Sequence, residues 1–185
     1  MNDIQKKYLK HVIYEISNFI EFHKFLSKKN IITRYNKSNK DINNKNNLKN
    51  VLHFNSYLNS YLIFLRNLTD FLYLDKNVGI SILDFVEKNK WDKIKPDYEY
   101  KNDVQPHKNN IHTVLPHLSK KRDELTNEEL HQSVKILSLL TIKGLIVFIE
   151  NIEGLNNKSG IIKLLKNCLK RTEKPASNTI FPISS

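Results

Sequence analysis

The sequence predicts an all-α protein, a bundle of four main helices with one or two short additional helices. Apolar residues recur at spacings of three and four along most of the chain, which is the period of a helix with one buried face. The chain has only four Gly and five Pro, too few for the many turns of a β-sandwich or barrel. Its 185 residues are enough for one domain with a buried core.

The segment 57–75, YLNSYLIFLRNLTDFLYLD, is the most apolar helical stretch, and we expect it at the centre of the bundle. The helix that contains it is predicted from about residue 48 to residue 74. Two charged residues, Arg66 and Asp70, interrupt its apolar pattern. Because they are four positions apart, they project from the same side of the helix and can form an ion pair. We expect these charges to be paired or to line a polar site.

Three other main helices are predicted: residues 127–152 form the centre together with this helix, and the other two pack on them. The first spans residues 3–27 and carries an apolar stripe of helical period. The second spans residues 106–122, and Pro116 is expected to kink or shorten it. The third spans residues 127–152, is apolar almost all round, and starts with a capping box whose first residue is Thr126.

The remaining segments are predicted to be short helices and loops. Residues 80–88 fit one or two helical turns, and residues 89–105 fit an irregular excursion held against the core by Trp91. Residues 28–47 are polar, basic and rich in Asn, so we expect a mobile loop there. Residues 159–170 form a short basic amphipathic helix, for which docking on the bundle is favoured over association with a membrane.

These elements divide the chain into a helical-bundle domain, residues 1–153, and a C-terminal part, residues 154–185, which holds the short basic helix and a disordered tail. No segment offers a membrane-spanning run of uninterrupted apolar residues, so no membrane span is expected. The N-terminus has no apolar signal-peptide core, and the single cysteine, Cys168, excludes an intramolecular disulfide. We therefore expect a cytoplasmic protein that holds no metal and no cofactor.

The net charge of +11 is concentrated at the two ends of the chain. Residues 1–50 carry eleven basic and four acidic side chains, and residues 154–185 carry six and one, whereas the segments between them sum to −1. Basic ends attract RNA, other phosphates or acidic partners. The alternative explanation is compositional, because 26 Lys against 4 Arg, together with 24 Asn, is the bias of an AT-rich coding sequence.

Three of the seven His lie close together in the sequence, at His107, His112 and His117. Steps of five residues advance about 140° beyond a full helical turn, so the three side chains do not share one face and a three-His metal site is disfavoured. A single His from this group can still serve in acid–base or phosphate chemistry, because His titrates near neutrality. The sequence has no Gly-rich phosphate loop, Ser–His–Asp signature, EF-hand or HExxH pattern.

Two blocks of sequence carry a family resemblance. The first is RNLTDFLY (66–73), followed by LDFVEK and Trp91, and the second is NNIHTVLPHLSKKR (109–122). Together they resemble a bacterial group of small helical proteins in the HEPN-like superfamily, whose later helix carries an Arg-x(4–6)-His motif. The resemblance covers roughly residues 55–150. It implies a helical bundle and metal-independent RNA cleavage at a dimer interface, in a defence or toxin–antitoxin setting.

Matched residue by residue, the resemblance assigns the motif histidine to His117, the hydroxyl after it to Ser119 and the trailing arginine to Arg122. Arg66 and Asp70 fall in the first block. In members that cleave RNA, the Arg polarises the phosphate and the His moves protons of the ribose 2′-hydroxyl, which requires a cation and a group that titrates near pH 7. The implied catalytic residues are His117, Arg122 and Arg66.

The chain departs from the motif at two positions. The motif arginine falls on Asn110, and the motif asparagine falls on His112. The cation at the phosphate must then come from another basic residue: Arg66, Lys108, His112 or Arg122. The implied binding residues are Asp70, Lys108, Asn110, His112 and Ser119.

Two other interpretations stay open. In one, Arg66 and Asp70 form a buried ion pair, tied to His117 or Arg122, that only fixes the register of the helices. In the other, the protein is noncatalytic and its apolar bundle face meets a partner protein, as in an antitoxin or a scaffold subunit. A polar cleft, open to solvent, in which Arg66, His117 and Arg122 converge beside a basic surface favours RNA or nucleotide binding by a homodimer. Mutually satisfied charges and an exposed apolar patch favour protein binding.

Overall fold

The computed structural model describes residues 1–28, 31, 34, 37–73, 79–114 and 126–173. Over these residues the chain is helical and contains no β-strand, which confirms the predicted all-α class. The longer helices are α1 (Asp3–Leu26), α3 (Lys45–Tyr73), α5 (Gln105–Val114), α6 (Asn127–Asn151) and α7 (Lys158–Thr172). The shorter ones are η2 (Ile82–Asp84), α4 (Lys88–Ile94) and η3 (Tyr100–Val104), the last a π-helical turn that leads into α5.

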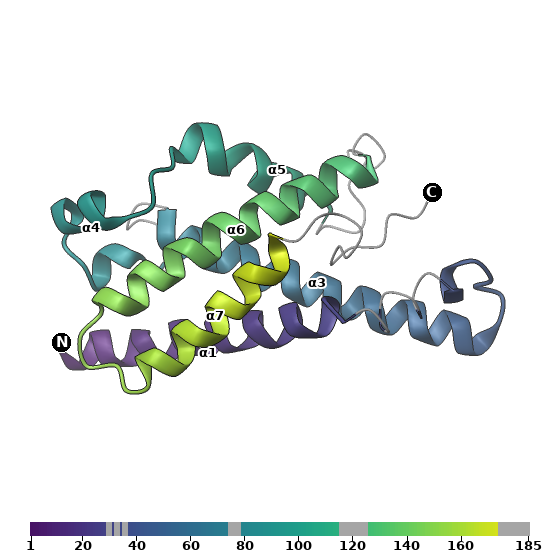
Figure 1. The fold of residues 1–185 in the computed structure, drawn as a ribbon, viewed down its shortest axis with the longest axis horizontal. Coiled ribbons are helices and arrows are strands. Elements are labelled where there is room, and N and C mark those ends of the chain that lie inside the picture. The colour runs from purple at the N-terminus through teal and green to yellow at the C-terminus, as the bar shows by residue number, and fades with distance from the viewer. Residues whose placement is uncertain (29–30, 32–33, 35–36, 74–78, 115–125, 174–185) are drawn as a thin grey trace.

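Helices α1 and α3 pack antiparallel along a seam of aromatic rings (Figure 1). Phe19 stacks on Tyr61 with ring centroids 5.2 Å apart, and Phe25 stacks on Tyr57 with centroids 4.0 Å apart. Later residues of α1 therefore meet earlier residues of α3. Such ring pairs add about 0.5–1.5 kcal/mol each beyond the apolar area that they bury.

Helix α3 also packs on α6, through buried hydroxyl pairs. The Tyr61 hydroxyl lies 2.7 Å from that of Ser138, and the Thr69 hydroxyl lies 2.9 Å from that of Thr141. All four residues are fully or almost fully buried, so each hydroxyl satisfies a partner that water cannot reach. Helix α3 contacts α1, α5 and α6, while α6 contacts α3, α5 and α7, so these two helices form the centre.

Helix α7 docks on α1 and α6, which is the arrangement that its sequence favoured. Its Leu165 and Cys168 are buried in the common hydrophobic core. The Thr172 hydroxyl lies 2.9 Å from Nε2 of His23 in α1, and Arg171 donates to the Ser27 hydroxyl at 3.2 Å. The apolar face of α7 is therefore covered by protein, as a docked helix requires and a membrane-bound helix does not.

Trp91 is 4 % exposed, which confirms that it anchors its segment against the core. The segment itself is more regular than predicted, because residues 88–94 form helix α4 where an irregular excursion was expected. The turn before it, η2, starts with a capping box at Ser81, whose hydroxyl accepts from the Leu83 amide at 3.2 Å. This local cap closes a helical turn without a long apolar stripe.

Helix α6 starts at the predicted capping box. The Glu129 amide donates to the Thr126 hydroxyl at 3.2 Å, and the Thr126 amide donates to the Glu129 carboxylate at 2.8 Å. Residues Glu128–Asn151 are long and apolar enough to cross a membrane by length and composition alone. Within the part of the chain that the structure describes, this is the one such helix, and 61 % of its most apolar window is buried inside the protein. A helix in the core of a folded protein is buried to this extent.

Helix α3 begins at Lys45, inside the segment that the sequence assigns to a loop (28–47). Before it, residues 37–39 are also helical, and Ser38 is buried and accepts a hydrogen bond from the Asn50 amide group at 3.1 Å. Part of the segment that was predicted as a loop is therefore helical. Figure 1 shows that the N-terminal turns of α3 project beyond α1 and α6.

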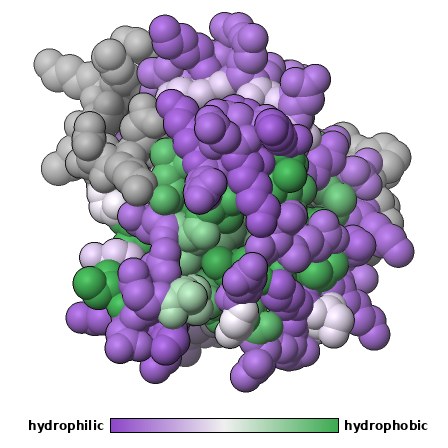
Figure 2. Space-filling view, turned by 90° about the vertical axis from the view of Figure 1, so that its left-hand side faces the viewer, coloured by the Kyte–Doolittle hydropathy of each residue, from purple (hydrophilic) through white to green (hydrophobic). Residues whose placement is uncertain are grey.

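Figure 2 faces the opposite end of the molecule, where α1 starts and where α4 and η2 lie. Apolar side chains form the middle of this end and hydrophilic side chains surround them. The amide of Gln5 in α1 donates to the backbone carbonyl of Asp84 at 2.7 Å, which ties η2 to the bundle. The core therefore comes close to the surface at this end.

Candidate functional site

Helix α5 presents its polar side chains to two different neighbours. Toward α6, the Asn110 amide donates to the Ser133 hydroxyl at 2.9 Å, and Nδ1 of His107 lies 3.2 Å from the same oxygen. Toward α3, Lys108 forms an ion pair with Asp70. Residues three or four apart share a face of a helix, so positions 107 and 110 form one set and positions 108 and 112 form the other.

Asp70 pairs with Lys108 of α5, and not with Arg66, which was one of the two arrangements that the sequence left open. Lys108 is almost completely buried, and its ammonium also lies 3.4 Å from the hydroxyl of Tyr100. The spacing within α3 placed Arg66 on the correct side of the helix, but the packing of α5 brings another cation into contact with the carboxylate.

Arg66 is half-buried, and its Nε is buried without a hydrogen-bond acceptor among the described residues. A guanidinium N–H that is removed from water and left unpaired costs about 1–3 kcal/mol or more. Such a donor is rare in a folded protein and calls for an explanation, of which a missing anionic ligand is one.

His112 lies at the exposed edge of the same group of side chains. Partial burial lowers the pKa of its imidazole, and the positive charges of Arg66 and Lys108 lower it further, while Asp70 acts in the opposite direction. The two cations thus outweigh the carboxylate at this position, and the imidazole is held neutral near pH 7.

We call Arg66, Asp70, Lys108 and His112 the α3–α5 cluster. It holds three basic side chains around one carboxylate, with one end buried at Lys108 and the other open to solvent at His112. This arrangement suits an anion that enters from the solvent side. No group of three or more side chains that commonly bind metals gathers in the described ranges of the chain.

The structure brings together four of the eight residues that the sequence singled out. Asn110 lies apart from them, because its side chain faces Ser133 of α6. His117, Ser119 and Arg122 lie outside the described residues. An arginine at position 110 would project from the face of α5 that meets α6, away from the cluster. The cations of the α3–α5 cluster are therefore Arg66 of α3 and Lys108 of α5.

Sequence reasoning missed Tyr100 and Ser133. Tyr100 lies in a segment predicted to be irregular, and Ser133 is one of several small polar residues in a largely apolar helix. No local pattern marks either one, because their roles come from contacts with α5. The α3-facing pair could have been found, since Lys108 and His112 are four residues apart on a predicted helix.

No protein-family model, no curated protein and no solved structure matches this chain. The case for a function therefore rests on the α3–α5 cluster and on the surface around it.

Proposed function

We propose that the protein binds RNA or a nucleotide, and that the α3–α5 cluster holds a phosphate group. The observation that carries this proposal is Arg66, whose buried Nε has no acceptor in the described part of the chain although Lys108 and His112 lie beside it. A phosphate oxygen supplies the acceptor, and a guanidinium binds phosphate through paired N–H groups. The net charge of +11 adds a long-range attraction for a polyanion.

Metal-independent RNA cleavage is the finer form of this proposal. It rests on the resemblance to the HEPN-like superfamily, which assigns the proton transfer to His117. His112 is a second candidate for the residue that transfers this proton. Its pKa is lowered, and a neutral imidazole beside two cations can accept the proton of a 2′-hydroxyl near a bound phosphate. The same resemblance implies a cytoplasmic homodimer in a defence or toxin–antitoxin setting, and these features belong to the proposal.

A noncatalytic role in protein binding is the second candidate. Exposed apolar side chains favour it: Leu52 is 56 % and Leu48 is 42 % exposed on the projecting part of α3, and Ile42 just before it is 51 % exposed. Large apolar side chains that gather on a surface mark binding sites for other proteins.

Binding is tested with the full chain and a labelled single-stranded RNA in EDTA, by fluorescence anisotropy at about 50 and 200 mM salt. The variant is Arg66→Met, which removes the positive charge together with the buried Nε that has no acceptor among the described residues. We expect weaker binding. The slope of the logarithm of the binding constant against the logarithm of the salt concentration should decrease in magnitude by about 0.7, because the protein neutralises one phosphate fewer. Lys143→Met, which removes an exposed lysine of α6, is the matched control and should change the affinity much less.

Cleavage is followed in the same EDTA samples with His117→Ala and His112→Ala. Loss of cleavage in His117→Ala with binding retained supports the nuclease proposal. Loss of cleavage in His112→Ala would instead identify His112 of the α3–α5 cluster as the general base. Binding without cleavage by the wild type limits the protein to an RNA-binding role. No binding by the wild type at the lower salt concentration rejects the proposal for RNA and favours protein binding.

A further inference from the structure

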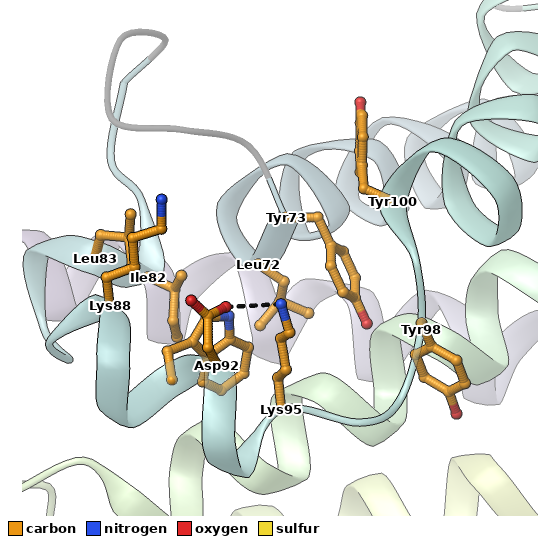
Figure 3. Close-up of a pocket in the computed structure, with 10 residues that line it drawn as sticks. Leu72, Tyr73, Ile82, Leu83, Lys88, Asp92, Lys95, Tyr98 and Tyr100 are labelled. Carbon is orange, nitrogen blue, oxygen red and sulfur yellow. Dashed lines mark hydrogen bonds and ion pairs between the residues drawn. The ribbon is translucent and has the colours of Figure 1, made fainter.

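A pocket of about 180 Å³ lies beside the α3–α5 cluster (Figure 3). Its wall is built from the end of α3, from η2 and α4, and from the segment that leads to α5. Pockets that enclose a whole drug-sized ligand usually measure roughly 300–1,000 Å³. This pocket is smaller, so it fits a single ring system and not a complete nucleotide.

The lining of the pocket combines aromatic and aliphatic side chains with the charged residues Lys88, Asp92 and Lys95. Figure 3 shows Lys95 pointing toward Asp92, with which it forms an ion pair of 2.7 Å. Lys88 also acts on Asp92, so two cations face one carboxylate. The aromatic lining residues are Tyr73, Trp91, Tyr98 and Tyr100, and the aliphatic ones are Leu72, Ile82 and Leu83.

The pocket and the cluster share a wall. The hydroxyl of Tyr100, which lines the pocket, lies 3.4 Å from the ammonium of Lys108, and that ammonium lies 6.0 Å from the centre of the Tyr100 ring. On α3, Tyr73 of the pocket follows Asp70 of the cluster by three residues, which is one helical turn and a rise of about 4.5 Å. A ligand bound at the cluster therefore has the pocket within reach.

We propose that this pocket receives a nucleobase of the RNA or nucleotide whose phosphate is held by the α3–α5 cluster. The inference rests on the proposed function and adds where the base lies. Every base has a π-face that stacks on aromatic side chains without regard to sequence, and the aromatic lining offers such faces. Lys88 and Lys95 supply N–H donors for the carbonyl oxygens or ring nitrogens of a base.

The chain contains a single tryptophan, and that residue lines the pocket. Its emission therefore reports on the pocket without interference from other tryptophans, while anisotropy of labelled RNA reports on binding as a whole. Two probes are compared: a short mixed-sequence single-stranded RNA, and an abasic oligonucleotide of equal length that keeps the phosphates and lacks the bases.

We expect the RNA to change the Trp91 emission with the same midpoint as the anisotropy, and the abasic oligonucleotide to leave the emission unchanged. Tyr98→Leu should weaken RNA binding by roughly five-fold or more, which is the loss of one stacked base, and leave abasic binding unaltered. Tyr14→Leu is the matched control, because Tyr14 is exposed on α1 and does not line the pocket. Lys88→Ala, with Lys90→Ala on the same helix as its control, tests the polar edge.

The outcomes separate the two proposals. RNA and abasic binding of equal strength that both depend on Arg66, with no change in Trp91 emission, overturns the pocket inference and leaves the proposed function in place. No binding of either oligonucleotide and no change in Trp91 emission overturns both. Circular dichroism of each variant confirms that a loss of binding does not come from unfolding.

Discussion

His23 is the residue whose burial ties the stability of the fold to pH. It is fully buried, its Nε2 contacts Thr172, and its Nδ1 is buried without a partner among the described residues. Burial lowers the pKa of its imidazole to about 3, and the nearby positive charge of Arg171 contributes to the shift. The side chain is therefore folded into the core in its neutral form.

We predict that the free energy of unfolding falls as the pH drops from about 6.5 toward 3. In this range the unfolded chain takes up a proton at His23 that the folded chain excludes, which costs about 1.4 kcal/mol per pH unit for one group. Above about pH 6.5 neither the folded nor the unfolded chain binds this proton, so His23 causes no loss of stability there. Urea unfolding curves at about pH 7 and about pH 5 measure the difference.

His23→Gln is the informative variant for this prediction, because it keeps an amide that can bond to Thr172 and removes the titration. Its pH slope between neutral and acid conditions should be smaller than that of the wild type. His53→Gln, at an exposed position of α3, is the matched control and should keep the wild-type slope. Equal slopes for the wild type and His23→Gln would contradict the prediction.

At the scale of one element, the start of α6 depends on its capping box. The Thr126 hydroxyl and the Glu129 carboxylate each accept a hydrogen bond from the other residue's backbone amide. Two amide groups at the start of the helix are thereby satisfied. The hydrogen bonds that the Thr126 amide and hydroxyl donate to the Glu129 carboxylate hold the pKa of this carboxyl below its usual range.

We predict that Thr126→Ala lowers the free energy of unfolding by about 1 kcal/mol, because the cap at the start of α6 is lost. For a chain of this size, that corresponds to a decrease in Tm of about 2–4 °C, measurable by differential scanning calorimetry. Thr126→Ser keeps the hydroxyl and should restore most of the loss. A Tm that is the same in Thr126→Ala and the wild type would show that the cap contributes nothing.

At the scale of the whole molecule, α7 is an integral part of the packed core. Leu165 of α7 and Trp91 of α4 belong to the same hydrophobic cluster. We predict that Leu165→Ala destabilises the protein by about 2–5 kcal/mol through the cavity that it leaves. The loss should appear as a lower midpoint of one cooperative transition, seen alike by circular dichroism and by Trp91 fluorescence.

The neighbouring Leu164 provides the control for this prediction, since it is 37 % exposed. Leu164→Ala should change the midpoint far less than Leu165→Ala. If α7 unfolded independently of the bundle, the circular dichroism of Leu165→Ala would change in a separate early step and the Trp91 transition would stay in place.

The sequence alone determined the helices. The apolar period located α1, α3, α6 and α7 to within a few residues at each end, and Thr126 marked the start of α6, because period and capping are properties of one segment. Where the apolar period was weak, as in α4 and at residues 37–39, the prediction of loop was wrong. Those turns depend on side chains that are buried, such as Trp91 in the hydrophobic core and Ser38, which accepts a hydrogen bond from Asn50 of α3.

The tertiary structure alone decided the candidate site. The spacing of Arg66 and Asp70 allowed either a pair within α3 or a polar site, and the contact of Asp70 with Lys108 depends on how α5 lies against α3. The same packing turned Asn110 toward α6 and gave the aromatic pocket its walls from four segments. Distances between helices are set by the whole core, which no local pattern encodes, and so the site emerged only when the helices were assembled.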